Sequence, residues 1–129
     1  MEGGLKELLA IGLAGAVGSV ARYAVSGLAA RWWGESFPWG TLTVNALGAL
    51  VLGFVAGFAL VSDGLPPSVR IPIATGFLGA FTTFSTFSVE TIRLAEKEPW
   101  LALGNVLVSI LLGLVLAAAG LAAGRWAAG

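Results

Sequence analysis

Residues 76–88 read GFLGAFTTFSTFS, and this stretch decides how the chain folds. Two glycines precede five hydroxyl side chains and three phenylalanines, all inside an otherwise apolar segment. Glycine, serine and threonine weaken helical regularity, and non-helical backbone at membrane depth survives only where protein or a wet cavity covers it. The stretch therefore predicts one of two structures. Either the helix breaks near Gly79 to Thr83 and aims backbone carbonyls inward, where they could hold a cation such as Na⁺, or it is continuous and its hydroxyls bond to their own turn.

The composition around this stretch is that of a membrane protein. Of the 129 residues, 57% are hydrophobic and only 11% are charged, with a mean hydropathy of +0.92, whereas a soluble domain carries about 25% charged residues. The chain has no cysteine and no histidine, which excludes disulfides, thiolate metal sites and histidine acid–base chemistry. Its net charge is zero and no basic run is present, so nucleic acid is not an expected partner.

Four apolar segments are long enough to cross a bilayer core, which needs about 20 residues of helix. They run approximately over residues 5–30, 39–61, 68–95 and 100–123. Short polar or proline-bearing breaks separate them, and all five tryptophans lie near their ends, as in an interfacial aromatic belt. The sequence predicts an all-α, multi-pass membrane protein with one four-helix transmembrane domain over residues 1–129.

The charges at the two ends of this bundle give almost no orientation signal. Loops this short force neighbouring helices to be antiparallel, so both termini and the loop near Ser62 share one side. That side carries three Lys and Arg residues and the other carries four: Lys6, Arg70 and Arg125 against Arg22, Arg31, Arg93 and Lys97. Either the orientation signal is weak, or the chain inserts in both directions.

Two polar stripes stand out on the charge-free segments. Asn45 and Thr41 are four residues apart on the second segment, and Asn105 and Ser109 are four apart on the fourth. A side-chain amide in hydrocarbon is unfavourable unless it is paired, so Asn45 should face protein or water. Its NH₂ group is either helix–helix glue or a donor to an anion.

Aromatic and basic residues offer a second route to anion binding. Phe84 and Phe87 share a helix face near Thr83 and Thr86, which argues against simple lipid contact. An aromatic ring is positive at its edge, so ring edges in a dry passage can stabilise an anion without a full charge. Arg22 either snorkels to the membrane surface or makes a vestibule attractive to anions.

Three segments together resemble the Fluc/CrcB family of fluoride channels. They are residues 15–23, residues 38–48 with the pattern P-x-G-T-L-x-x-N-x-x-G, and residues 76–87, and their order and spacing fit along essentially the whole chain. The resemblance implies an antiparallel, dual-topology homodimer of four-helix subunits with a broken third helix. It also implies two fluoride pathways along the dimer interface and a structural sodium ion at the centre.

The resemblance also implies a role for each site residue. Backbone carbonyls of Gly79 and Thr82 would hold Na⁺. The fluoride pathway would take its lining from the donor Asn45, two phenylalanines, three hydroxyls and a vestibule arginine: Asn45, Phe84, Phe87, Thr41, Ser85, Thr86 and Arg22. A pore tyrosine that some members have on the fourth helix is not evident, and Asn105 or Ser109 is expected in its place. Ala80 stands where many members have a second glycine.

The leading hypothesis is a passive channel in the inner (plasma) membrane of a prokaryote, through which fluoride leaves the cell and which confers fluoride resistance. The alternative is a dual-topology small multidrug transporter, which needs a membrane-embedded carboxylate. Glu90, toward the end of the third segment, is the nearest candidate. A purely structural subunit would leave residues 76–88 unexplained. An enzyme is not expected, because the sequence offers no nucleophile–base pair.

Overall fold

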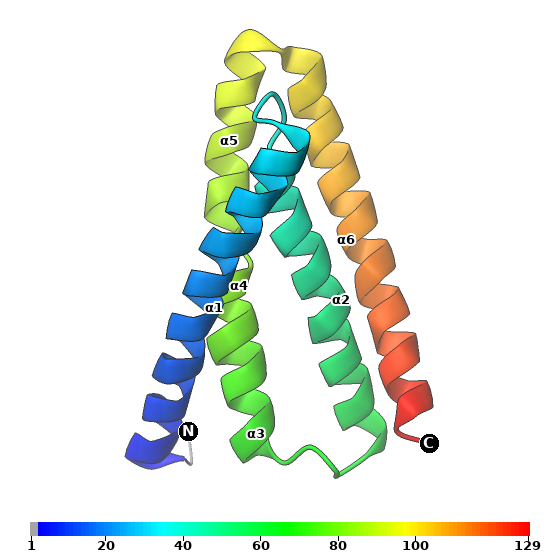
Figure 1. Cartoon of the computed structure of the whole chain (residues 1–129). Coiled ribbons are helices and arrows are strands. Elements are labelled where there is room, and N and C mark those ends of the chain that lie inside the picture. Colours follow the sequence, from blue (N-terminus) through cyan, green and yellow to red (C-terminus); the bar gives the residue numbers. More distant parts are fainter. Residues whose placement is uncertain (1–2) are drawn as a thin grey trace.

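The computed structural model describes residues 3–129, and over these residues the chain is helical with short connections. Three helices are long and apolar enough to cross a membrane by length and composition: α1 (Gly4–Trp33), α2 (Trp39–Val61) and α6 (Pro99–Ala127). Between α2 and α6 lies a segment built of four shorter pieces (Figure 1): α3 (Pro67–Ile71), η1 (Pro72–Leu78), α4 (Gly79–Phe81) and α5 (Phe84–Lys97).

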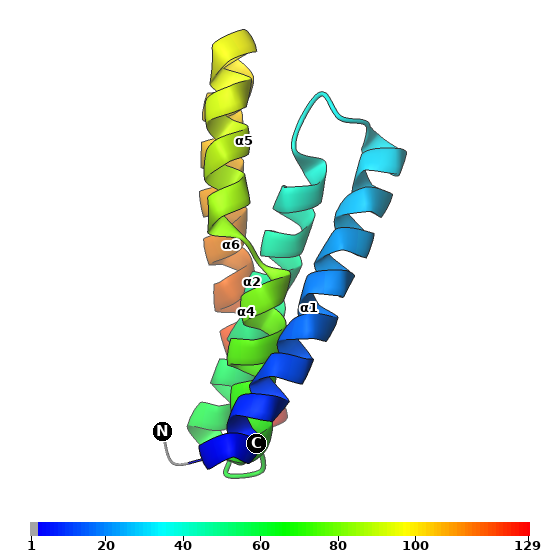
Figure 2. The same ribbon diagram turned by 90° about the vertical axis from the view of Figure 1, so that its left-hand side faces the viewer.

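The elements are arranged as an up-and-down bundle whose helices are splayed rather than parallel. The start of α1, the α2–α3 loop and the C-terminus lie together at one end of the molecule, and the α5–α6 connection lies at the other (Figure 1). In the side view, the far ends of α5 and α1 diverge (Figure 2). In Figure 1, by contrast, the helices spread apart toward the end that carries the termini, so each end of the bundle is splayed in one direction.

The long helices extend beyond the apolar segments seen in the sequence. The first covers residues 4–33 where 5–30 is expected, and α6 covers 99–127 where 100–123 is expected. α1 stops at Gly34, whose φ of +83° favours glycine. Thirty helical residues measure about 45 Å, more than the ~30 Å hydrocarbon core, so the helix ends continue into the interfacial layer.

Glycines bring α2 and α6 into backbone contact. A β-carbon added at Gly57 would collide with the carbonyl oxygen of Leu121, and one added at Gly120 would collide with that of Leu50. Gly53 and Gly124 make reciprocal approaches on the same two helices. Such small-xxx-small pairs allow close packing where lipid removes the hydrophobic drive for helix association. α2 and α6 therefore form the frame against which the broken segment is placed.

The broken segment leaves helical geometry at two residues. Thr82 has φ −87° and ψ 159°, and Thr83 has φ −153° and ψ 113°, both extended. Helix geometry resumes at Phe84, and α5 then runs antiparallel to the start of α6 (Figure 1). The break thus lies within the range 79–83 that the sequence singles out, with Gly79 itself still helical.

Candidate functional site

The Asn45 side chain, on α2, forms two hydrogen bonds with the backbone of Thr83 at the helix break, and we call this pair of bonds the clamp. Its side-chain NH₂ group donates to the Thr83 carbonyl oxygen at 3.0 Å, and its carbonyl oxygen accepts from the Thr83 N–H at 2.7 Å. Both backbone groups of Thr83 are therefore satisfied by one side chain that lies 38 residues away in sequence. The amide NH₂ has a second N–H, which these two bonds do not use.

The clamp changes the bonding of the two carbonyls expected to face a cation. In a continuous α-helix the Thr83 N–H would donate to Gly79 and the Thr86 N–H would donate to Thr82. Here the Thr83 N–H goes to Asn45, and the Thr86 N–H goes to the Thr83 hydroxyl at 3.2 Å. The Gly79 and Thr82 carbonyls thus lose the donors that a helix would supply, which leaves their oxygens open to another partner.

Hydroxyl groups gather at the start of α5. The Thr83 hydroxyl caps this helix, lies 3.0 Å from the Thr86 hydroxyl and 3.3 Å from that of Ser85. An N-cap threonine satisfies a helix-terminal N–H, which explains why α5 begins immediately after the break. Ser85 and Thr86 are exposed on the subunit.

Phe84 and Phe87 follow on the first turn of α5. Their ring centroids are 5.7 Å apart and their planes are tilted by 45°. Phe84 is 79% exposed, whereas Phe87 is half-buried. Because the two ring planes are tilted, the pair offers ring edges as well as ring faces to a neighbouring group.

A second polar cluster connects α5 with α6. Asn105, which is 1% exposed, donates to the Thr91 hydroxyl at 2.9 Å and accepts from the Ser109 hydroxyl at 3.3 Å. One turn of α5 separates Thr91 from Phe87, whose carbonyl oxygen accepts from the Thr91 hydroxyl at 2.7 Å. At Glu90, the residue before Thr91, a buried carboxylate oxygen has no hydrogen-bond partner within the described part of the chain.

The structure does not bring every expected pathway residue to the break. Asn45, Ser85, Thr86 and the two phenylalanines meet there, while Ser109 belongs to the α5–α6 cluster. Thr41 lies one turn before Asn45 on α2 and is buried. Arg22 is half-buried in α1.

Two residues that sequence reasoning did not assign to the site take part in it. Thr83 is the centre of the clamp and the cap, and Thr91 is the partner of Asn105. A threonine followed by a helix is a common N-cap, which was a usable signal for Thr83. No comparable local pattern marks Thr91, because its partner Asn105 lies on another helix.

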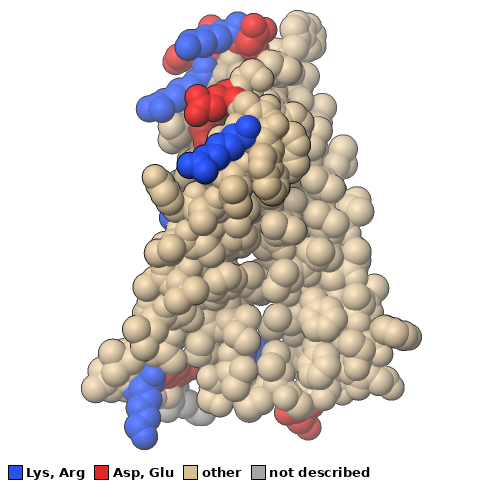
Figure 3. All heavy atoms as spheres, viewed as in Figure 1, with Lys and Arg blue, Asp and Glu red and all other residues tan. Residues whose placement is uncertain are grey.

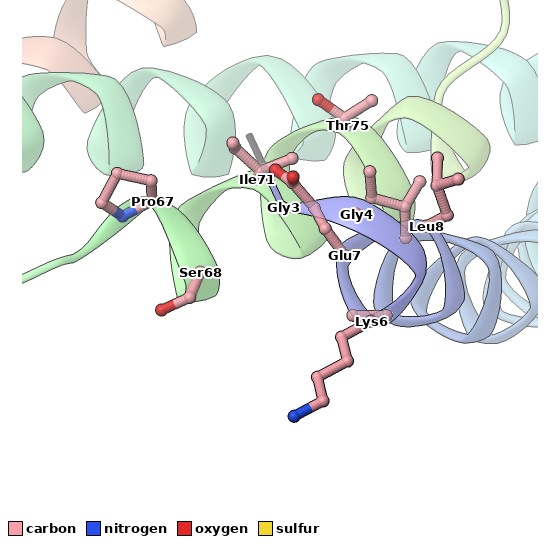
Figure 4. Close-up of a pocket in the computed structure, with 11 residues that line it drawn as sticks. Gly3, Gly4, Lys6, Glu7, Leu8, Pro67, Ser68, Ile71 and Thr75 are labelled. Carbon is pink, nitrogen blue, oxygen red and sulfur yellow. The ribbon is translucent and has the colours of Figure 1, made fainter. Parts of the chain in front are cut away.

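A separate hollow lies at the end that carries the termini. It is lined by the start of α1 and by α3 and η1, including Lys6, Glu7, Ser68 and Thr75. In Figure 4 the Lys6 side chain points away from this hollow, while Glu7 turns toward Gly3. None of its lining residues belongs to the break, so it is not part of the candidate pathway.

Among the described residues, charged side chains other than Arg22 in α1 and Glu90 in α5 lie near helix ends or in connections. In Figure 3 they gather at the two ends of the visible face, and the broad band between is almost free of them. The break lies between α4 and α5, about midway along the molecule (Figure 1). Neutral donors and aromatic rings, rather than fixed charges, therefore dominate the surroundings of the break.

Comparison with known proteins gives a consistent result. The family described as "CrcB-like protein, Camphor Resistance (CrcB)" matches residues 9–121. A protein of Geobacter sp. (strain M21) is 50% identical over 107 residues, covering 82% of this chain and 86% of its own length. One from Nitratidesulfovibrio vulgaris is 47% identical over 122 residues, covering 94% and 98%. Both relatives bear the name fluoride-specific ion channel FluC.

Proposed function

The chain belongs to the CrcB family, and on that premise we propose that it is a fluoride-selective ion channel formed by two antiparallel copies of the subunit. The observation that carries the proposal is the break at Thr82–Thr83, which Asn45 clamps beside exposed hydroxyls and phenylalanine rings. Relatives that share about half of its residues are named fluoride-specific ion channels.

The chemistry of this site suits a small, strongly hydrated anion. Fluoride must lose water to enter a narrow passage, and hydrogen-bond donors have to offset that loss. The unused N–H of Asn45, the hydroxyls of Ser85 and Thr86, and the ring edges of Phe84 and Phe87 supply such groups. A full positive charge at this depth would bind fluoride too tightly for release, so neutral donors favour conduction. Thr41 and Ser109 extend the polar path, and Arg22 attracts anions toward its mouth.

A second copy of the chain accounts for the exposed polar face. In a lone subunit the exposed Ser85 and Thr86, next to the exposed ring of Phe84, would leave hydroxyls facing lipid. Covering this face with an antiparallel copy removes the hydroxyls from hydrocarbon and encloses two symmetric pathways. The split of Lys and Arg between the two ends is compatible with insertion in both orientations.

A structural sodium ion fits the two carbonyls at the break. The donors that would satisfy Gly79 and Thr82 in a helix are bonded to Asn45 and Thr83 instead. Together with the same pair from the second copy, these oxygens make a set of neutral ligands of the kind that Na⁺ accepts at broken membrane helices. When bound, the ion would neutralise converging carbonyl dipoles that lipid cannot satisfy.

The proposed role in the cell is passive export. Hydrogen fluoride crosses the membrane of a prokaryote as a neutral acid and ionises inside. The membrane potential, negative inside, then drives the anion out through the channel, which gives resistance to fluoride. No energy coupling is needed, which fits a site without a fixed charge.

Coupled drug transport is the less favoured alternative. It requires a carboxylate at the substrate site, and Glu90 is the nearest candidate. Glu90 lies two turns of α5 beyond the break, and relatives that are 42–50% identical are named fluoride-specific ion channels.

A growth assay tests the cellular role. Bacteria that lack their own fluoride exporter would express either this protein or its Asn45→Asp variant at matched membrane levels. We expect the parent, and not the variant, to restore growth in millimolar fluoride at about the rate of unexposed cells. Equal sensitivity with and without the parent protein would contradict the proposal.

A further inference from the structure

The segment before the break contains a wide helical turn. Residues Pro72–Leu78 form a π-helix, and the Gly79 N–H at its end donates to the carbonyl oxygen of Ala74, five residues earlier. A π turn accommodates one more residue than an α turn and is rare, often marking functional sites. Here it lies directly before the carbonyls proposed to hold the cation.

Pro72 gives a physical reason for the turn. In a regular helix its missing N–H would leave the Ser68 carbonyl without a donor, and its ring would press on that oxygen. The π-helix begins at Pro72 itself, so the helix widens at the residue where an α-helix would be disrupted. The preceding Pro67 does no such damage, because it is the first residue of α3, where an N–H has no helical partner in any case.

Glycine in α1 provides the space that the wide turn needs. A β-carbon at Gly18 would collide with the carbonyl oxygen of Phe77, inside the π turn. In the other direction, a β-carbon at Gly76 would lie 2.7 Å from the Ile11 carbonyl oxygen. By contrast, Gly12 on the same helix has nothing within 4 Å of that position. The π-helical backbone therefore packs directly against α1, in the space left by the missing side chain of Gly18, which we call the slot.

The extra residue sets how the following turn is rotated. One residue of an α-helix corresponds to about 100° about the axis, so removing the π turn would rotate residues 79–82 by that amount. At present Leu78 is 2% and Phe81 7% exposed, packed inside the subunit, whereas Gly79 faces outward. A regular helix would turn Gly79 away from the subunit surface and would misplace Thr83 with respect to Asn45.

We propose that Pro72 and Gly18 are positioning residues: Pro72 imposes a π turn, Gly18 accommodates it, and the turn rotates the Gly79 and Thr82 carbonyls into the position where they hold a cation at the dimer centre. This inference rests on the proposed function for the identity of the cation. It adds a device, located outside the break, that sets the geometry of the break.

The test measures thermal unfolding of the purified protein in detergent while NaCl replaces choline chloride. A ligand that binds the folded state raises the unfolding midpoint as its concentration rises. The parent should show such a sodium response. Pro72→Ala should need about tenfold more sodium for the same response, yet in sodium-free buffer it should be at least as stable as the parent, because alanine favours the helix.

That combination separates positioning from ordinary packing. A merely structural proline would, when replaced, change stability equally at every sodium concentration. The matched control Pro67→Ala should retain the parental response. Gly18→Ala should weaken the sodium response as Pro72→Ala does, and Gly12→Ala should not.

Two results would overturn the inference. One is a parental sodium response in both Pro72→Ala and Gly18→Ala. The other is a parent protein without any sodium response, which would leave the turn with nothing to position. Fluoride efflux is measured separately, so a sodium-responsive protein that passes no fluoride would refute the proposed function and leave this inference standing.

Discussion

At the scale of single residues, the Asn45 side chain links the fold and the proposed pathway. It uses one N–H and its carbonyl oxygen on the backbone of Thr83 and keeps one N–H for another partner. The two roles open from the sequence, helix–helix glue and anion donor, are thus compatible in one side chain. The first is observed in the structure, and the second belongs to the proposed function.

Replacing Asn45 with Asp tests both roles. Asp retains the size and can still accept from the Thr83 N–H, but it would place a carboxylate oxygen against the Thr83 carbonyl oxygen, which now receives an N–H at 3.0 Å. We expect the unfolding free energy to fall by about 1–3 kcal/mol and fluoride efflux from liposomes to fall to background. Leu114→Ile, on the exposed face of α6, is the control and should behave as the parent. A folded Asn45→Asp dimer with parental efflux would remove Asn45 from the pathway.

Replacing Phe84 or Phe87 with Ile tests the ring edges. Isoleucine keeps apolar bulk but has no quadrupole, so each change should reduce fluoride efflux by about tenfold or more while the dimer stays intact on size exclusion. Phe54→Ile, a change on the far half of α2, is the matched control and should leave efflux unchanged. If both variants at the break matched this control, the rings would serve packing alone.

The sequence was sufficient to mark these residues as unusual but not to pair them. A polar side chain in an apolar segment must find a partner, which singles out Asn45 and Asn105. Their partners are a backbone 38 residues away and a threonine across the α5–α6 connection, and neither leaves a periodic signal. Thr83 and Thr91 were therefore missed as site residues.

At the scale of elements, the frame formed by α2 and α6 depends on glycines that face each other's backbone. Gly120 packs on Leu50, whereas Gly113, two turns earlier on the same helix, has open space around it. The four-residue spacings from Gly53 to Gly57 and from Gly120 to Gly124 are visible in the sequence, but they do not show which partner helix receives each glycine. The structure identifies α2 and α6 as the closely packed pair.

Alanine at these two glycines should have opposite effects. Gly120→Ala forces the helices apart and should lower the unfolding free energy by about 1–3 kcal/mol. Gly113→Ala meets no atom and should be neutral or stabilising by about 0.5–1 kcal/mol, because alanine restricts the unfolded chain. Denaturation of the purified dimer in detergent measures both, and equal destabilisation would contradict the packing described here.

The third segment shows where pattern reasoning ends. Hydroxyls and glycines in residues 76–88 predicted either a break or a continuous helix, and the structure has the break at Thr82–Thr83. The break is stabilised by the Asn45 clamp, which is a tertiary contact between α2 and Thr83 and leaves no local pattern in the sequence. The π turn at Pro72–Leu78 was not foreseen, since it depends on a proline and on a slot in α1 that no local pattern reveals.

At the scale of the whole molecule, family membership confirms the resemblance that three short segments indicated, with a match over residues 9–121. The apolar composition correctly indicated a membrane protein. Composition could not indicate which molecule covers the exposed face of Phe84, Ser85 and Thr86, because assembly depends on surfaces rather than on helix-forming patterns. The antiparallel dimer therefore stays a prediction.

Single-cysteine labelling tests the dual orientation. The chain has no cysteine, so Ser62→Cys and Ser36→Cys place one thiol at each end of the bundle. If the chain inserts both ways, an impermeant reagent should label about half of each variant in intact cells. Complete labelling at one position and none at the other would establish a single orientation and exclude an antiparallel dimer.

The most direct measurement of the central claim is fluoride efflux from liposomes containing the purified protein, with valinomycin to balance charge and ion-selective electrodes for fluoride and chloride. A fluoride channel should release trapped fluoride within seconds to minutes while chloride stays inside. Protein-free liposomes and the Asn45→Asp protein set the background. Retention of fluoride by the folded parent dimer, or equal loss of fluoride and chloride, would contradict the account.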